Sequence, residues 1–171
     1  FFYIDGVYTI IDMATAYGTS LGLNTNGLLL ALLLTQIVAF PASLTFAVLS
    51  KTKDTASLIK VAIIAYFLIA LFAVQLDKQW EFWVLAVAVG CFQGGIQALS
   101  RSYFAKIIPE NASGEYFGLF DICGKGASFL GTMLIGVVTQ ITGKQNLGVA
   151  ALSIMFVIGY LIFNKVSKMD D

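Results

Sequence analysis

Histidine is absent from this 171-residue chain, and charged residues make up only 12% of it. Without histidine the chain lacks the commonest general base, the commonest metal ligand and the usual pH switch of proteins. A soluble domain carries about 25% charged residues, so the charge content also argues against that class. We therefore expect neither an enzyme nor a protein that holds a metal or another cofactor.

Cysteine and net charge exclude further classes. The two cysteines, Cys91 and Cys123, both lie inside apolar runs. In that setting they are expected to be small core residues and not a disulfide or a metal pair. The formal net charge is zero and no run of basic residues occurs, so the sequence gives no indication of a nucleic-acid partner.

Long apolar runs are what the chain does contain. Hydrophobic residues make up 58% of it and the mean hydropathy is +0.86, which indicates a membrane protein. A bilayer core about 30 Å thick requires roughly 20 apolar residues per helix. Short, turn-rich segments separate the runs, so residues 1–171 are expected to form a single all-α domain. Its six predicted transmembrane helices span residues 2–22, 26–49, 56–76, 80–104, 115–141 and 146–166.

Lysine and arginine predict the orientation of the helices. Seven of the ten lie on the side that holds the second loop, the fourth loop and the C-terminal tail, whereas Lys78 and Lys144 lie on the other side. Because positive residues are retained on the cytoplasmic side, both termini are expected to be cytoplasmic. The chain begins with Phe inside an apolar run, so we also expect it to be a piece of a longer protein.

Small and polar residues mark two faces of the fourth predicted helix. Ala86, Gly90, Gly94, Ala98 and Ser102 recur at every fourth position, and such a ridge allows another helix to approach closely. We interpret Gly90 and Gly94 as helix-packing residues. On another face, Gln93, Gln97 and Arg101 are also four residues apart. Their polar groups require partners, which an interhelical ladder or a substrate would supply.

The fifth predicted helix carries opposite charges four residues apart, at Asp121 and Lys125. The acid precedes the base, which is the better order for an ion pair on a helix. Ionisable residues within a membrane are functional candidates by default, although a structural salt bridge would have the same spacing. Both residues are therefore candidates for a substrate or ion pathway.

The first predicted helix carries Asp5 and Asp12, which are seven residues apart and hence share one face. Together with Asp121, the spans contain three carboxylates against one lysine. A carboxylate without a partner in hydrocarbon tends to take up a proton, as a proton-coupling site requires and as an inert acid also would. Asp5 and Asp12 are likewise assigned to the candidate substrate or ion pathway.

Three stretches carry a family resemblance: "DGVYTIIDMATAYG" at 5–18, "GGIQALSRSYFAKIIP" at 94–109 and "GEYFGLFDICGKGASFLG" at 114–131. With them the chain resembles the C-terminal six-helix half of a major facilitator superfamily transporter, of the family of the autophagy-related vacuolar amino-acid effluxer. The resemblance implies half of a twelve-helix fold, with the first and fourth helices lining a central cavity. It would place Asp5, Asp12, Gln93 and Gln97 toward that cavity.

The leading functional hypothesis is therefore half of a secondary transporter that moves a small solute, such as an amino acid or a related metabolite, by alternating access. The partners implied are the N-terminal six-helix half, the lipid bilayer, the solute and protons, and an isolated chain is expected to self-associate. A bacterial inner or plasma membrane is the expected location. Two alternatives remain: a six-helix substrate-binding membrane subunit of a larger importer, and an aspartyl intramembrane protease that pairs Asp5 or Asp12 with Asp121.

Overall fold

In the computed structural model, which describes residues 1–109, 112–126 and 128–168 apart from the side chain of Lys125, the chain is a bundle of helices. Within these residues seven helices follow one another: α1 (Phe2–Ser20), α2 (Thr25–Leu49), α3 (Thr55–Ala73), α4 (Gln79–Ile107), α5 (Ser113–Lys125), α6 (Phe129–Thr142) and α7 (Gln145–Ser167). The described residues contain no strand. The all-α prediction is confirmed.

Five stretches are long and apolar enough to cross a membrane, within the described part of the chain. They are 25–49, 55–73, 79–107, 113–142 and 145–167, and α1, which carries Asp5 and Asp12, is not among them. The predicted bounds agree with the helices to within a few residues, except in the fifth span. There α5 ends at Lys125 and α6 begins at Phe129, with residue 127 outside the described residues, whereas 113–142 counts as one apolar span.

Local sequence explains where the helices begin and end. The side chain of Asn24 accepts hydrogen bonds from the amides of Asn26 and Gly27 at the start of α2. Asp54 does the same for α3 through the amides of Ala56 and Ser57. These side chains satisfy amides that a helix leaves without partners at its N-terminus. Capping side chains thus help to determine where α2 and α3 begin, next to the apolar runs of the sequence.

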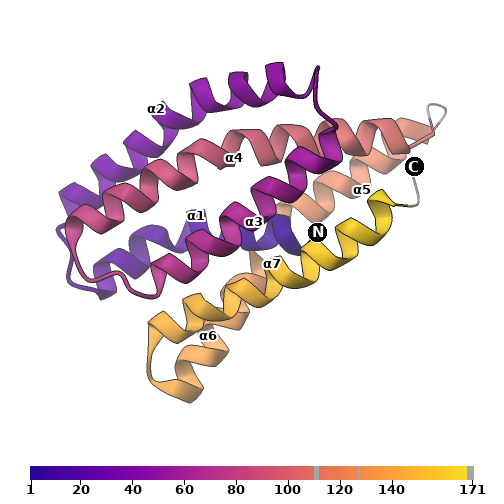
Figure 1. Cartoon of the computed structure of the whole chain (residues 1–171). Helices are drawn as coiled ribbons and strands as arrows, with labels where there is room; N and C mark the ends of the chain where they lie inside the picture. The colour runs from indigo at the N-terminus through magenta and orange to yellow at the C-terminus, as the bar shows by residue number, and fades with distance from the viewer. Residues whose placement is uncertain (110–111, 127, 169–171) are drawn as a thin grey trace.

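Helix α1 runs through the middle of the bundle, with α2, α3, α4, α6 and α7 packed around it. Glycines make several of these contacts close: Phe156 of α7 lies over Gly6, and Tyr3 lies against Gly159. The buried core includes Val7, Ile59, Tyr66 and Phe156. Figure 1 also shows that the α2–α3 connection, the end of α4 and the end of α7 lie toward the same end of the bundle.

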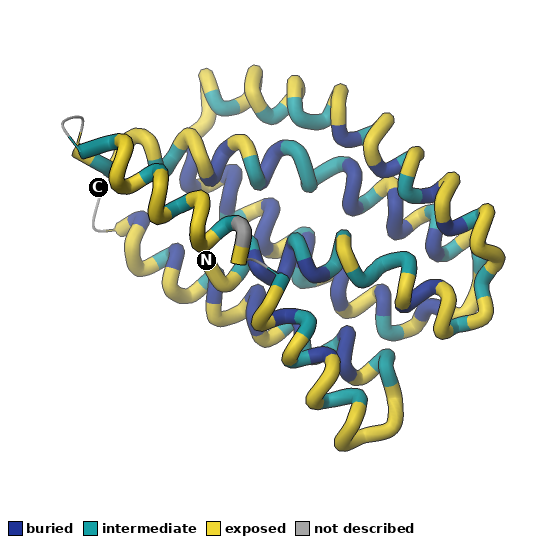
Figure 2. Tube along the Cα trace, turned by 180° about the vertical axis from the view of Figure 1, so that it is seen from behind, coloured by how far each residue is buried: buried dark blue, intermediate teal, exposed yellow. Residues whose placement is uncertain are grey.

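Helices α2 and α4 form the most extensive contact, and Ala86, Gly90 and Gly94 of the ridge of small residues on α4 lie within it. A Cβ atom on Gly90 would come within 2.7 Å of the backbone oxygen of Thr35, and one on Gly94 within 2.8 Å of Ser43. The opposite face of α2 is exposed, as the outer side of the uppermost helix in Figure 2 shows. Helix α2 therefore packs on one side only.

Candidate functional site

An open cavity of about 920 Å³ lies between the ends of α1, α4, α5 and α7. Its walls are mainly aromatic and aliphatic, with polar groups from Tyr8, Gln97, Ser100, Arg101 and Asp121. A cavity of this size, mostly apolar with a few polar groups, is typical of a small-molecule site. Gln97 and Asp121, two of the candidates from the sequence, are therefore brought to one cavity.

Arg101 on α4 and Asp121 on α5 form an ion pair in the wall of this cavity. The guanidinium donates to the carboxylate at 3.0 Å, and the side chains are 62% and 54% exposed. Arg101 also lies 5.8 Å from the centre of the Phe120 ring. Since both charges remain accessible, the pair can exchange one partner for a charged group on a ligand.

Aromatic contacts tie α5 to α4 next to this ion pair. The Phe104 ring lies 4.8 Å from the Phe120 ring and 5.7 Å from the Phe117 ring, measured between centroids. Nearby, the hydroxyl groups of Tyr3 and Ser100 are hydrogen-bonded at 2.8 Å across α1 and α4. These contacts join α5 to α4 and α1 to α4 around the cavity.

Asp121 has a partner on a neighbouring helix, and the pairing with Lys125 expected from helix spacing stays a prediction. Its described partner is Arg101, which is twenty residues away in the sequence, whereas the side chain of Lys125 lies outside the described residues. Helix α5 lies against α4 through the rings of Phe104, Phe117 and Phe120. Arg101 therefore reaches Asp121 from the neighbouring helix.

Asp5 and Asp12, which the sequence placed on one face, lie in different environments. Asp5 is fully buried, and its Oδ1 atom accepts a hydrogen bond of 3.1 Å from the amide of Gly131, near the start of α6. Asp12 is exposed, and it lines neither the large cavity nor the smaller one described below. Gln93 is also outside both linings, and its side-chain oxygen is buried without a hydrogen-bond partner among the described residues.

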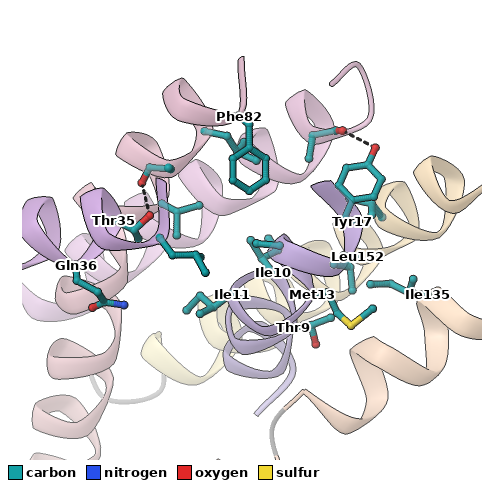
Figure 3. A pocket seen from close by; sticks show the side chains of 17 residues that line it. Thr9, Ile10, Ile11, Met13, Tyr17, Thr35, Gln36, Phe82, Ile135 and Leu152 are labelled. Carbon is teal, nitrogen blue, oxygen red and sulfur yellow. Dashed lines mark hydrogen bonds between the residues drawn. The ribbon is translucent and has the colours of Figure 1, made fainter. Parts of the chain in front are cut away.

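A second cavity, of about 60 Å³, lies deeper in the bundle and is shown in Figure 3. Ile10, Phe82, Leu152 and other apolar side chains line it. Its hydroxyl groups are already satisfied: Tyr17 donates to the backbone oxygen of Ala73, and Thr35 lies within hydrogen-bonding distance of the backbone oxygens of Ala31 and Ala86. Apart from the amide of Gln36, this space therefore offers a polar solute few groups to bind.

Sequence reasoning did not find the contact between α1 and the break in the fifth span. Thr9, Ser128 and Gly131 meet there beside Asp5. The glycines around this segment, in "GKGASFLG", were the available signal, but glycine is common in membrane helices and does not by itself reveal a break.

Comparison with known proteins decides the family. The family model described as "Vacuole effluxer Atg22 like" matches residues 1–169. The chain belongs to this family. It is 46% identical over 162 residues to the uncharacterized MFS-type transporter YxiO of Bacillus subtilis, covering 95% of the chain and 38% of that protein.

More distant relatives are fungal. Identity with autophagy-related protein 22 is 34% over 95 residues for Eremothecium gossypii and 36% over 92 residues for Candida glabrata. These matches cover 56% and 54% of the chain but only 19% and 17% of the fungal proteins. The chain thus spans well under half the length of the relatives it matches, and no solved structure matches it.

The family membership confirms the resemblance and the membrane-embedded, MFS-type fold class predicted from the sequence. It gives no support to the protease hypothesis. That hypothesis requires two carboxylates at one site, and Asp121 is paired with Arg101 instead.

Proposed function

We propose that this chain is the C-terminal six-helix half of a secondary active transporter that moves a small solute by alternating access. The match to the Atg22-like family over residues 1–169 supports this, as does coverage of only 38% of the bacterial relative. Transporters of this kind bind the solute between two halves near the middle of the membrane. The chain would then supply one wall of the site and an N-terminal half the other.

The solute that fits this wall best is an amino acid or a related metabolite that carries both a carboxylate and an ammonium group. The single observation that carries the proposal is the accessible Arg101–Asp121 pair in a largely apolar cavity. Arginine binds carboxylates through two parallel hydrogen bonds, so a solute carboxylate can replace Asp121 on Arg101. The released Asp121 then accepts the solute's ammonium group, while Gln97 and the aromatic residues contact the remainder.

Two exposed apolar stripes are proposed as the surface for the N-terminal half, while other exposed apolar residues, such as Val61 and Leu68 of α3, would face lipid. Helix α2 exposes one stripe, formed by Leu29, Leu33, Ile37, Phe40, Leu44 and Val48. Helices α5 and α6 expose a second, formed by Leu119, Ile122, Phe129, Met133, Val137 and Ile141. In the absence of the partner half, detergent or a second copy would cover these stripes. We therefore expect the isolated chain to self-associate in mild detergent.

A bacterial plasma membrane is the proposed location, given the Bacillus relative. The lysine count predicts that both termini are cytoplasmic, and the end of α7 lies toward the same end of the bundle as the end of α4. The large cavity would therefore open toward the cytoplasm.

Transport in proteoliposomes tests the proposal. The chain is co-expressed with the N-terminal half, and exchange of radiolabelled amino acids is compared with exchange of uncharged amides of the same side chains. Arg101→Gln should lower exchange about tenfold or more, because a hydrogen bond to a charged group contributes roughly 1.5–3 kcal/mol. Lys144→Gln removes a positive charge from the far α6–α7 turn and serves as the matched control. Equal exchange of amides and amino acids, or an unaffected Arg101→Gln variant, would contradict the proposed solute.

A further inference from the structure

Gln93 is the central residue of α4 and carries a buried polar atom without a partner. Helix α4 runs from Gln79 to Ile107 over 29 residues, so Gln93 lies at its midpoint. The side-chain oxygen of Gln93 is buried and accepts no hydrogen bond from the described residues. A buried acceptor without a donor costs free energy, and most buried polar groups of proteins are therefore paired. The unpaired oxygen thus calls for a donor from outside the bundle.

The face of α4 that carries Gln93 joins the walls of the two cavities. Val89, one turn before Gln93, lines the small cavity, and Gln97, one turn after it, lines the large one. Ala86 and Ser100, seven residues before and after Gln93, line the small and the large cavity respectively. Residues four and seven apart share one face of a helix. Gln93 itself lines neither cavity, so it lies between them on their common wall.

Helix α1 forms a second wall that is common to both cavities. Tyr8 lines the large cavity, and Ile11, nearly one turn later, lines the small one. The small cavity also includes Tyr17, near the end of α1, and Phe82, near the start of α4 (Figure 3). The two cavities therefore follow one another along the length of the bundle, and the bundle is closed between them at the level of Gln93.

The depth of Gln93 in the membrane distinguishes it from the ion pair at the mouth of the large cavity. Helix α4 is long and apolar enough to span a membrane, so its central residue lies near the middle of the bilayer. Transporters bind their solute at this depth. Arg101 lies two turns further along α4, about 12 Å away along the helix axis. The amino and carboxyl groups of one amino acid cannot reach both residues, so a solute would contact them one after the other.

We propose that Gln93 is the central solute contact of this half. The solute moves from the Arg101–Asp121 pair to the level of Gln93, where its ammonium group donates a hydrogen bond to the amide oxygen. The inference rests on the proposed transport function and adds to it the place at which the two cavities become continuous. A solute without an N–H donor would leave the oxygen unpaired, and sites of this kind discriminate strongly against such solutes.

Substitution of Gln93 separates a solute contact from a structural role. Methionine has a similar unbranched side chain without the amide, so Gln93→Met should keep or raise Tm, because it removes an unpaired buried acceptor. With the N-terminal half in proteoliposomes, the same variant should lower amino-acid exchange about tenfold, as expected for a lost hydrogen bond to a charged group. Gln93→Asn keeps the amide and should retain more exchange. Gln140, an exposed glutamine of α6, provides the matched control, and Gln140→Met should change neither quantity.

Thiol labelling tests the passage without measuring transport. Cys91 and Cys123 are replaced by serine, and a single cysteine is placed at position 93 or 99 of the full chain, co-expressed with the N-terminal half in membrane vesicles. Leu99 is buried and lines neither cavity. A small, positively charged methanethiosulfonate reagent should label position 93, because the cavities become continuous there when the transporter opens. Position 99 should remain unlabelled.

Three results would overturn the proposal. A lower Tm of Gln93→Met would show that the amide oxygen has a structural partner, and unchanged exchange in that variant would show that the solute does not use it. Equal labelling of positions 93 and 99 would exclude a passage at Gln93. Selective labelling of position 93 in a preparation that exchanges no amino acid would refute the transport proposal, and with it the solute contact, while the passage itself would stand.

Discussion

Thr9 on α1 occupies the space in which any side chain on Gly131 of α6 would lie. A Cβ atom built on Gly131 would overlap the hydroxyl oxygen of Thr9, which belongs to a fully buried residue. The two helices therefore approach each other as closely as their backbones allow. This contact fixes the start of α6 against α1 and places the Gly131 amide on Asp5.

Gly131→Ala should consequently lower the free energy of unfolding by about 1–3 kcal/mol, the usual cost of overpacking a core. Thermal or denaturant unfolding in detergent measures the change. Gly136→Ala is the matched control on the same helix, because a Cβ atom at Gly136 would meet no described atom of another helix within 4 Å. That variant should be neutral or more stable by up to about 1 kcal/mol, since alanine favours the helix. Equal effects of the two variants would mean that α6 does not contact α1 at Gly131.

The ion pair between Arg101 and Asp121 should matter little for stability. Both side chains are more than half exposed, and exposed pairs typically contribute about 0.2–1 kcal/mol. Asp121→Asn should therefore lower the free energy of unfolding by no more than about 1 kcal/mol while impairing solute exchange. Unfolding and exchange measured on the same preparation separate the two effects. A stability loss of several kcal/mol would show that Asp121 is instead paired in a dry core.

Asp54 should make the stability of α3 depend on pH. The hydrogen bond from the Ser57 amide is the main cause that lowers the pKa of this carboxyl group below its ordinary value of 3.8. The hydrogen bond from the Ala56 amide adds to the effect. Because the folded-state pKa is the lower one, the stabilisation is complete above about pH 4 and is lost as pH falls through the folded-state pKa.

Asp54→Ala should cost about 0.5–2 kcal/mol at pH 7, because the helix loses its N-terminal cap. Asp54→Asn should retain most of the cap and lose the pH-dependent part. Unfolding of the natural chain and both variants between pH 7 and pH 3 provides the measurement. A decline with acid that is as steep in Asp54→Asn as in the natural chain would assign the pH dependence to other groups.

Cysteine labelling tests the proposed orientation. Cys91 and Cys123 are first replaced by serine, and single cysteines are then placed at 53, 106 or 78. Reagents applied from the cytoplasmic side should label positions 53 and 106, and reagents applied from outside should label position 78, as the distribution of lysines predicts. Labelling of all three positions from one side would rule out the proposed arrangement of spans.

Five of the six apolar segments, and the family, could be predicted from the amino-acid sequence. These follow from local properties, since a membrane helix satisfies its own backbone hydrogen bonds and needs only enough apolar residues to cross the bilayer. The spacing of Gly90 and Gly94 likewise indicated a close helix contact, and the structure gives α2 as the neighbour. Residue periodicity could not have identified that neighbour.

The environments of the ionisable residues, in contrast, depend on how the helices pack. Asp5 and Asp12 share a face of α1, yet only Asp5 is covered, because the start of α6 packs against one part of α1 and not along its whole length. Asp121 pairs with Arg101, a residue of the neighbouring helix α4 that helix spacing could not identify as its partner. The break before α6 could not be predicted from the sequence either, because it too depends on how the helices pack. An apolar run reads as continuous in sequence, while the contacts that stabilise its interruption come from α1, more than a hundred residues earlier in the chain.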